Sequence, residues 1–147
     1  MKKYSFIQKC AFFYALMFFA VAALDFIPGL KDQQGYLFGL FDLDTYDNSL
    51  HFFSGLWALI AAFVSTWQSI LYFKIFGTLY FLDGIMGLFL GNAFLDFGIF
   101  LYGIGDYSTF VKIFANLPHI AIGGIAIIIG FYLSKKPRLI ASNTNAY

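Results

Sequence analysis

The sequence has little of what a water-soluble protein needs. Charged residues make up 12% of its 147 residues, about half the share found in a typical soluble domain. Glutamate is absent, so all eight acidic residues are aspartates. With 61% hydrophobic residues and a mean hydropathy of +0.76, the chain carries more apolar surface than one core of this size can bury. We therefore expect the lipid bilayer to surround most of it.

The scarcity of cysteine and of basic residues excludes further classes. The single cysteine, Cys10, rules out an internal disulfide and a cysteine-based metal cage. The net charge is only +1, and the basic residues flank apolar segments without forming a stripe, which excludes a nucleic-acid partner. The sequence also has no glycine-rich phosphate loop, HExxH motif or nucleophile elbow. It therefore favours a role that is not enzymatic.

Four stretches approach the ~20 apolar residues that a helix needs to cross the hydrocarbon core. They are residues 6–27, 50–67, 70–90 and 117–133. The first follows two lysines, as a signal peptide would, but its apolar run continues past the candidate cleavage site, so we expect a retained helix. The sequence predicts an all-α integral membrane protein, a four-transmembrane-helix bundle over residues 1–134 with a short cytoplasmic tail at 135–147.

Both histidines occur in the same phrase, Asn-x-x-His-x-x-x-Gly. The first copy runs from Asn48 through His51, and the second runs from Asn116 through His119. The chain has only five asparagines, so the coincidence indicates a tandem duplication. Each copy opens a long apolar stretch, which gives the histidines equivalent places.

The duplication extends beyond this phrase. Segment 38–42 aligns with segment 102–106, and both end in aspartate. Each unit thus has a spanning helix, a short apolar segment, an aspartate, the asparagine–histidine phrase and a second spanning helix. An even number of spans per unit predicts two parallel two-helix repeats, at about 6–67 and about 70–133, related by an axis along the membrane normal.

The basic residues predict the orientation in the membrane. Seven of the nine precede the first helix, follow the fourth, or lie near the connection between the second and third. The other two, Lys31 and Lys112, share the two long connections with six of the eight aspartates. Because cytoplasmic segments carry the excess of lysine and arginine, we expect a multi-pass protein of the cell (plasma) membrane with both termini cytoplasmic.

The repeated phrase has a structural interpretation. If Asn48 and Asn116 are helix N-caps, each histidine lies at the third helical position and can reach back to the cap. A backbone group near the hydrocarbon needs such a partner whatever the protein does. The glycine four residues after each histidine lies on the same helix face, and small residues mark faces where membrane helices approach closely. We therefore expect His51 and His119 to face the bundle.

Two aspartates extend the predicted cluster. Asp25 falls near the outer end of the first helix, and Asp83 falls in the middle of the third. A carboxylate at that depth is costly and indicates a function or a specific polar partner. The sequence predicts a polar cluster, or candidate ligand-binding set, near the outer membrane face. Its members are Asn48, His51, Asn116, His119, Asp25 and Asp83.

Three functions remain open for this cluster. The first, which the sequence favours, is a structural or interaction role in a small membrane protein. The second is binding of haem or a divalent metal, with His51 and His119 as ligands. The third is proton or ion conduction involving Asp83. The small-residue faces could also support a homo-oligomer, and neither the activity nor the protonation of Asp83 follows from the sequence.

Several short motifs, in order, resemble a family of small bacterial membrane proteins catalogued as a domain of unknown function. The motifs are Phe26-Ile27-Pro28-Gly29-Leu30, Leu37-Phe38-Gly39-Leu40-Phe41, Asn48-x-x-His51, Phe76-Gly77-x-x-Tyr80 and Asn116-x-x-His119. The resemblance covers nearly the whole chain except its tail. It implies a four-helix membrane protein with the Asn-x-x-His motifs as hallmark positions, and it implies no activity. Asp83 is not part of the pattern.

Overall fold

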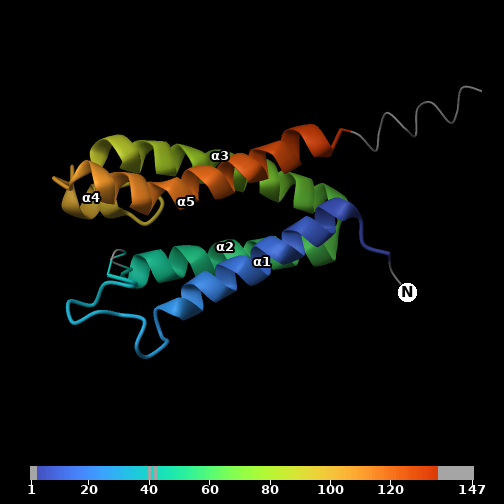
Figure 1. The fold of residues 1–147 in the computed structure, drawn as a ribbon. Coiled ribbons are helices and arrows are strands. Elements are labelled where there is room, and N and C mark those ends of the chain that lie inside the picture. The colour runs from blue at the N-terminus through green and yellow to red at the C-terminus, as the bar shows by residue number, and fades with distance from the viewer. Residues whose placement is uncertain (1–2, 40, 42, 136–147) are drawn as a thin grey trace, which may run out of the picture.

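The chain folds into helices joined by two long connections (Figure 1). The computed structural model describes residues 3–39, 41 and 43–135. The helices are α1 (Phe6–Leu24), α2 (Thr45–Val64), α3 (Thr66–Leu90), the short α4 (Gly98–Tyr102) and α5 (Thr109–Ile127), which continues into the π-helical segment η1 (Ile128–Leu133). The basic residues Lys2, Lys136 and Arg138, positions 40 and 42 of the predicted repeat, and the tail beyond 135 lie outside the described residues.

The predicted asparagine caps are wrong. Asp44 caps α2, because its side chain accepts hydrogen bonds from the first-turn amides, and Ser108 caps α5 in the same way. Asn48 and Asn116 therefore lie inside their helices, and the histidines are not in the first turn. An apolar-length criterion finds only the part of a helix that can face hydrocarbon. It misses a polar first turn that precedes this part.

The connection between the second and third helices also differs from the expectation. We placed it around residues 67–69, but α2 ends at Val64 and α3 starts at Thr66. Ser65 alone breaks the helix, with φ −168° and ψ 164°, and its hydroxyl accepts from the Gln68 amide. One residue thus ends one helix and caps the next, which forces the chain into a sharp reversal.

The helices pack as two pairs. The main contacts of α1 are with α2, and those of α3 are with α5. Figure 1 shows the ends of the described chain at one end of the bundle, where α2 also meets α3, and the two long connections at the other end. We call these the terminal end and the connection end. At the terminal end, the Gln8 side chain donates a 2.7 Å hydrogen bond to the Ala62 carbonyl and ties α1 to α2.

Among the described residues, three helical segments are long and apolar enough to cross a membrane: Phe6–Leu24, Thr66–Leu90 and Thr109–Leu133. These features are those of a membrane protein. With 20 residues, α2 is as long as α1, but its first two turns contain Asp47, Asn48 and His51, which make it more polar. For this reason α2 is not one of the three segments.

An aromatic core fills the space between the two pairs toward the terminal end. Tyr14 and Phe18 of α1 meet Tyr72, Phe73 and Phe76 of α3, and all five side chains are buried. Tyr72 and Phe76 stack with ring centroids 5.0 Å apart, and Phe18 meets Phe76 edge-on at 5.2 Å. This aromatic core lies next to the polar residues at the connection end.

The predicted small-residue faces are confirmed by their burial. Ala58 and Ala62 of α2 are fully buried, as is Ala126 of α5. A Cβ built on Gly123 would lie 2.8 Å from the Phe81 Cα and 3.0 Å from the Gly77 carbonyl oxygen. Close approach of α3 and α5 thus depends on small side chains at these positions.

Candidate functional site

Asp83 is the polar centre of the α3–α5 pair. Its side chain is fully buried, with 0% exposure. One carboxylate oxygen, Oδ1, accepts hydrogen bonds from the backbone amides of Phe94 (2.9 Å) and Leu95 (2.8 Å) in the second long connection. The other, Oδ2, lies 2.8 Å from Nδ1 of His119. The side chain therefore joins α3, α5 and the connection, and each oxygen has a partner, as a buried carboxylate requires.

His119 comes from the interior of α5. A Cβ on Gly84 would lie 2.8 Å from the His119 Cβ, so this glycine lets the histidine backbone approach α3. The imidazole stacks on Tyr80, with ring centroids 4.3 Å apart and an interplanar angle of 21°. With Asp83 holding Nδ1 and Tyr80 holding one face, the ring has a single orientation, which leaves Nε2 free for another partner.

His51 approaches from the other helix pair. Its ring centroid lies 6.4 Å from that of His119, with the rings nearly perpendicular, and it stacks on Phe18 at 6.0 Å. Its side chain is buried, and its Nδ1 has no hydrogen-bond partner among the described residues. The two histidines of the duplicated phrase thus face each other between the two helix pairs, a contact that the sequence left open.

The other three predicted residues have different partners. The Asn48 side-chain amide donates a 3.0 Å hydrogen bond to Asp25 Oδ2, and Asp25 also forms an ion pair with Lys31. This contact joins the end of α1 to the start of α2 and is separate from Asp83. The Asn116 amide donates a 2.9 Å hydrogen bond to the Lys112 carbonyl within α5.

A cavity of about 540 Å³ lies between the two helix pairs at the connection end. His51, His119, Asn116 and Tyr80 form part of its wall, and the ends of α1, α2, α3 and α5 and both long connections complete it. Asp83 does not line it, because His119 stands between them. Most of the wall is apolar or aromatic, and a few polar side chains converge on it, which is the usual composition of a ligand pocket of this size.

Two wall residues, Asp47 and Asp96, were not expected at the site. Asp47 lies in the first turn of α2, outside the three apolar spans, and both aspartates line the cavity. Burial, followed by repulsion from Asp96 and Asp44, raises the pKa of Asp47 to about 7. Both belong to the six aspartates that the sequence places in the two long connections. The spacing could have shown otherwise, because Asp47 lies four residues before His51 on one helix face.

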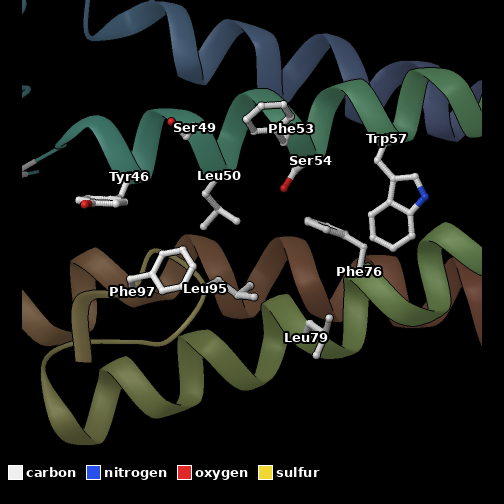
Figure 2. Close-up of a pocket in the computed structure, with 10 residues that line it drawn as sticks. All are labelled: Tyr46, Ser49, Leu50, Phe53, Ser54, Trp57, Phe76, Leu79, Leu95 and Phe97. Carbon is white, nitrogen blue, oxygen red and sulfur yellow. The ribbon is translucent and has the colours of Figure 1, made fainter. Parts of the chain in front are cut away.

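A second hollow of about 430 Å³ lies between α2 and α3. Figure 2 shows Leu50, Ser54 and Trp57 of α2 opposite Phe76 and Leu79 of α3. Its wall contains hydroxyl groups but no histidine, aspartate or lysine. It therefore offers apolar contact without the convergent polar groups of the larger cavity.

The described residues contain no group of three histidine, cysteine or acidic side chains placed to hold one metal ion. His51 and His119 supply at most two nitrogens. A haem iron between them would bring a porphyrin against Phe18 and Tyr80, which stack on the two imidazoles and pack edge-on at 5.5 Å. The geometry thus favours neither a complete zinc site nor an axial haem pair.

Residues 8–102 match the family described as Domain of unknown function (DUF4383), and because the match spans more than half of the chain, the chain belongs to this family. The match includes Asn48, His51 and Asp83 but ends before Asn116 and His119, so the family is shown for a shorter part of the chain than the motifs implied. No curated protein and no solved structure matches the chain.

Proposed function

We propose that this member of the family is a four-helix protein of the plasma membrane, built from two parallel two-helix units, that binds a small lipid-soluble molecule between its helix pairs. The pairing of α1 with α2 and of α3 with α5 agrees with two units. In this arrangement α2 is the fourth span, and its polar first turns lie at the membrane surface. Lys9 and Lys74 lie in the terminal half of α1 and α3, and Lys135 follows η1 at the same end, which makes this end cytoplasmic under the positive-inside rule.

The observation that carries the proposed function is the cavity with two histidines in its wall. Its volume of about 540 Å³ falls within the range of ligand pockets, which are mostly apolar and have few polar groups that fix orientation. The cavity reaches into the apolar part of the bundle, so its occupant must be soluble in lipid. The buried Asp83, which joins two helices and a connection, keeps this wall in shape.

The structural role favoured by the sequence is part of the same proposal. Asp83 and His119 fasten the second long connection to the α3–α5 pair, and Asn48 and Asp25 fasten the first helix pair. A purely structural cluster, however, would gain nothing from an open cavity beside it. Binding of a small molecule therefore accounts for both the polar cluster and the cavity.

The test is saturable binding of an apolar aromatic probe, 2-methoxynaphthalene, to the full chain in lipid nanodiscs. Equilibrium dialysis against empty nanodiscs removes partition into lipid. Ala115 lines the cavity, and Ala115→Trp should fill it and abolish saturable binding. Ala121, an exposed position six residues further along α5, provides the control, and Ala121→Trp should bind as the wild type does. Equal binding by both variants would contradict the proposed site.

A second candidate, binding of a single metal ion, rests on the 6.4 Å separation of the two imidazoles. The Asp83–His119 contact is the kind of outer interaction that orients a metal-ligating histidine. Elemental analysis after incubation with Zn²⁺ distinguishes the candidates: one zinc per chain, lost in His51→Ala, would favour metal binding.

Conduction of protons or ions is supported less well, because buried aromatic side chains fill the space between the cavity and the terminal end. A proton flux into liposomes that is lower for Asp83→Asn than for the wild type would support conduction.

A further inference from the structure

The identities of the atoms around His119 restrict what it can recognise. Asp83 accepts two backbone N–H groups at Oδ1, so the consistent partner for Oδ2 is a third donor, the Nδ1–H of His119. A neutral imidazole carries one proton. Its Nε2 is then a hydrogen-bond acceptor, and a ligand that meets it must supply a donor.

His51 offers the complementary group. His51 lines the cavity, and its buried Nδ1 has no hydrogen-bond partner among the described residues. A neutral ring has one N–H to donate and one lone pair to accept, so with Nδ1 as the unprotonated nitrogen the other ring nitrogen carries the N–H. A hydrogen bond of about 2.8 Å places a bound oxygen roughly 4 Å from each ring centroid. The two centroids are 6.4 Å apart, so one oxygen atom can contact both histidines. Among neutral groups, a hydroxyl both donates and accepts through one atom.

The rest of the wall indicates the shape of the ligand. Six aromatic side chains besides the histidines line the cavity: Phe18, Tyr36, Phe38, Phe41, Tyr80 and Tyr107. Rings favour planar, polarisable partners through stacked or edge-on contacts. Two imidazoles, each stacked on an aromatic ring of the protein, continue this surface toward the hydroxyl position.

We propose that the cavity recognises a planar aromatic alcohol, a phenol or fused-ring phenol, whose hydroxyl donates to Nε2 of His119 and accepts an N–H from His51. Asp83 is a positioning residue, because it fixes the tautomer and orientation of His119 without touching the ligand. The inference rests on the proposed binding function and adds the chemical class of the ligand. No covalent or redox step is involved.

The experiment compares 2-naphthol with 2-methoxynaphthalene, which has the same rings but cannot donate a hydrogen bond. Both are dialysed against the full chain in nanodiscs, with empty nanodiscs subtracted. The wild type should bind 2-naphthol about tenfold more tightly than the ether, the equivalent of one hydrogen bond to a buried group. His119→Phe should retain binding of the ether and bring the two dissociation constants together.

The positioning role has its own measurement. Asp83→Asn should reduce the preference for the hydroxyl, measured as the ratio of the two dissociation constants, because a general loss of packing would weaken both probes and would not alter this ratio selectively. Equal affinity of the wild type for the two probes would overturn the hydroxyl inference and leave the proposed binding function intact. Saturable binding of neither probe would overturn both. A preference that persists in His119→Phe would also reject the assignment, since another residue would then read the hydroxyl.

Discussion

His119 Nδ1 lies 2.8 Å from Asp83 Oδ2, and the carboxylate in this contact has no exposed surface. The two residues are 36 positions apart and belong to different helices. Their contact orients the histidine, and the other oxygen of the same carboxylate holds the second long connection through the Phe94 and Leu95 amides. Much of the expected behaviour of the protein depends on this pair.

Removing the Asp83 carboxylate should destabilise the protein strongly. In Asp83→Ala, two backbone amides and the His119 Nδ1–H lose a buried acceptor, and each such loss costs about 1–3 kcal/mol. We expect several kcal/mol of lost stability in thermal or denaturant unfolding in detergent. The control is Asp106→Ala, at an exposed aspartate of the same connection, which should unfold as the wild type does. A loss of equal size in both would show that the buried hydrogen bonds contribute little.

Two neighbouring glycines of α5 should respond in opposite ways to alanine. A Cβ on Gly123 would meet the backbone of Phe81, whereas a Cβ on Gly124 has its nearest neighbour, a Phe81 ring atom, at 3.8 Å. Gly123→Ala should therefore separate α3 from α5 and lower the melting temperature. Gly124→Ala should be neutral or stabilise by up to about 1 kcal/mol, because alanine favours the helix. If both variants melt with the wild type, α3 and α5 are not packed as closely as described.

Asp47 should make stability depend on pH. Burial and the neighbouring Asp96 and Asp44 raise its pKa from 3.8 to about 7, so between these values the folded state binds more protons than the unfolded state. The free energy of unfolding from this group therefore decreases as pH rises from about 4 to about 7 and then levels off. Tyr80 and His51 are titratable groups that line the same cavity as Asp47.

Unfolding of the wild type in detergent at pH 5 and at pH 8 checks this sign. Going from pH 5 to pH 8, the wild type should lose stability relative to Asp47→Asn, which stays neutral at both values. Asp106→Asn, at an exposed position, should leave the pH dependence as it is in the wild type. The same pH dependence in Asp47→Asn as in the wild type would rule out a contribution from the shifted Asp47 carboxyl.

The proposed orientation can be tested with a membrane-impermeant maleimide on intact cells. In a Cys10→Ser background, Asp106→Cys should react from outside, because it lies in a long connection. Ser134→Cys, at the terminal end, should react only after the membrane is opened. The reverse pattern would invert the proposed topology, and labelling of both from outside would mean that α2 or another helix does not cross.

Much of the site followed from the spacing of a few residues. The shared phrase around His51 and His119 predicted that they are equivalent and face the bundle, and their rings do meet. Asp83 was singled out because a carboxylate amid apolar residues needs a partner, and it has three. The caps were predicted wrongly. Asn48 and Asn116 are each only one of several polar residues near the start of a helix, and spacing alone does not say which of them caps it.

The roles of Asp47 and Asp96 could not have been read from their neighbours in the sequence. Asp47 stands in a polar stretch, whereas Asp96 is flanked by Leu95 and Phe97, and neither pattern points to the other aspartate. Only the packing of the second long connection against the start of α2 brings the two half-buried aspartates to one cavity wall. The same packing encloses the cavity, whose wall draws on four helices and both connections.

The sequence by itself determined the solvent of this protein and the places of its polar residues, because the hydrocarbon core imposes a minimum length of apolar helix and penalises every charge within it. The tertiary structure decided which polar groups meet. Helix pairing turns His119 toward Asp83, brings His51 across from the other pair and leaves Asn48 to a different aspartate. These outcomes depend on the rotation and approach of whole helices, which close packing of glycine and alanine faces sets and which no local spacing encodes.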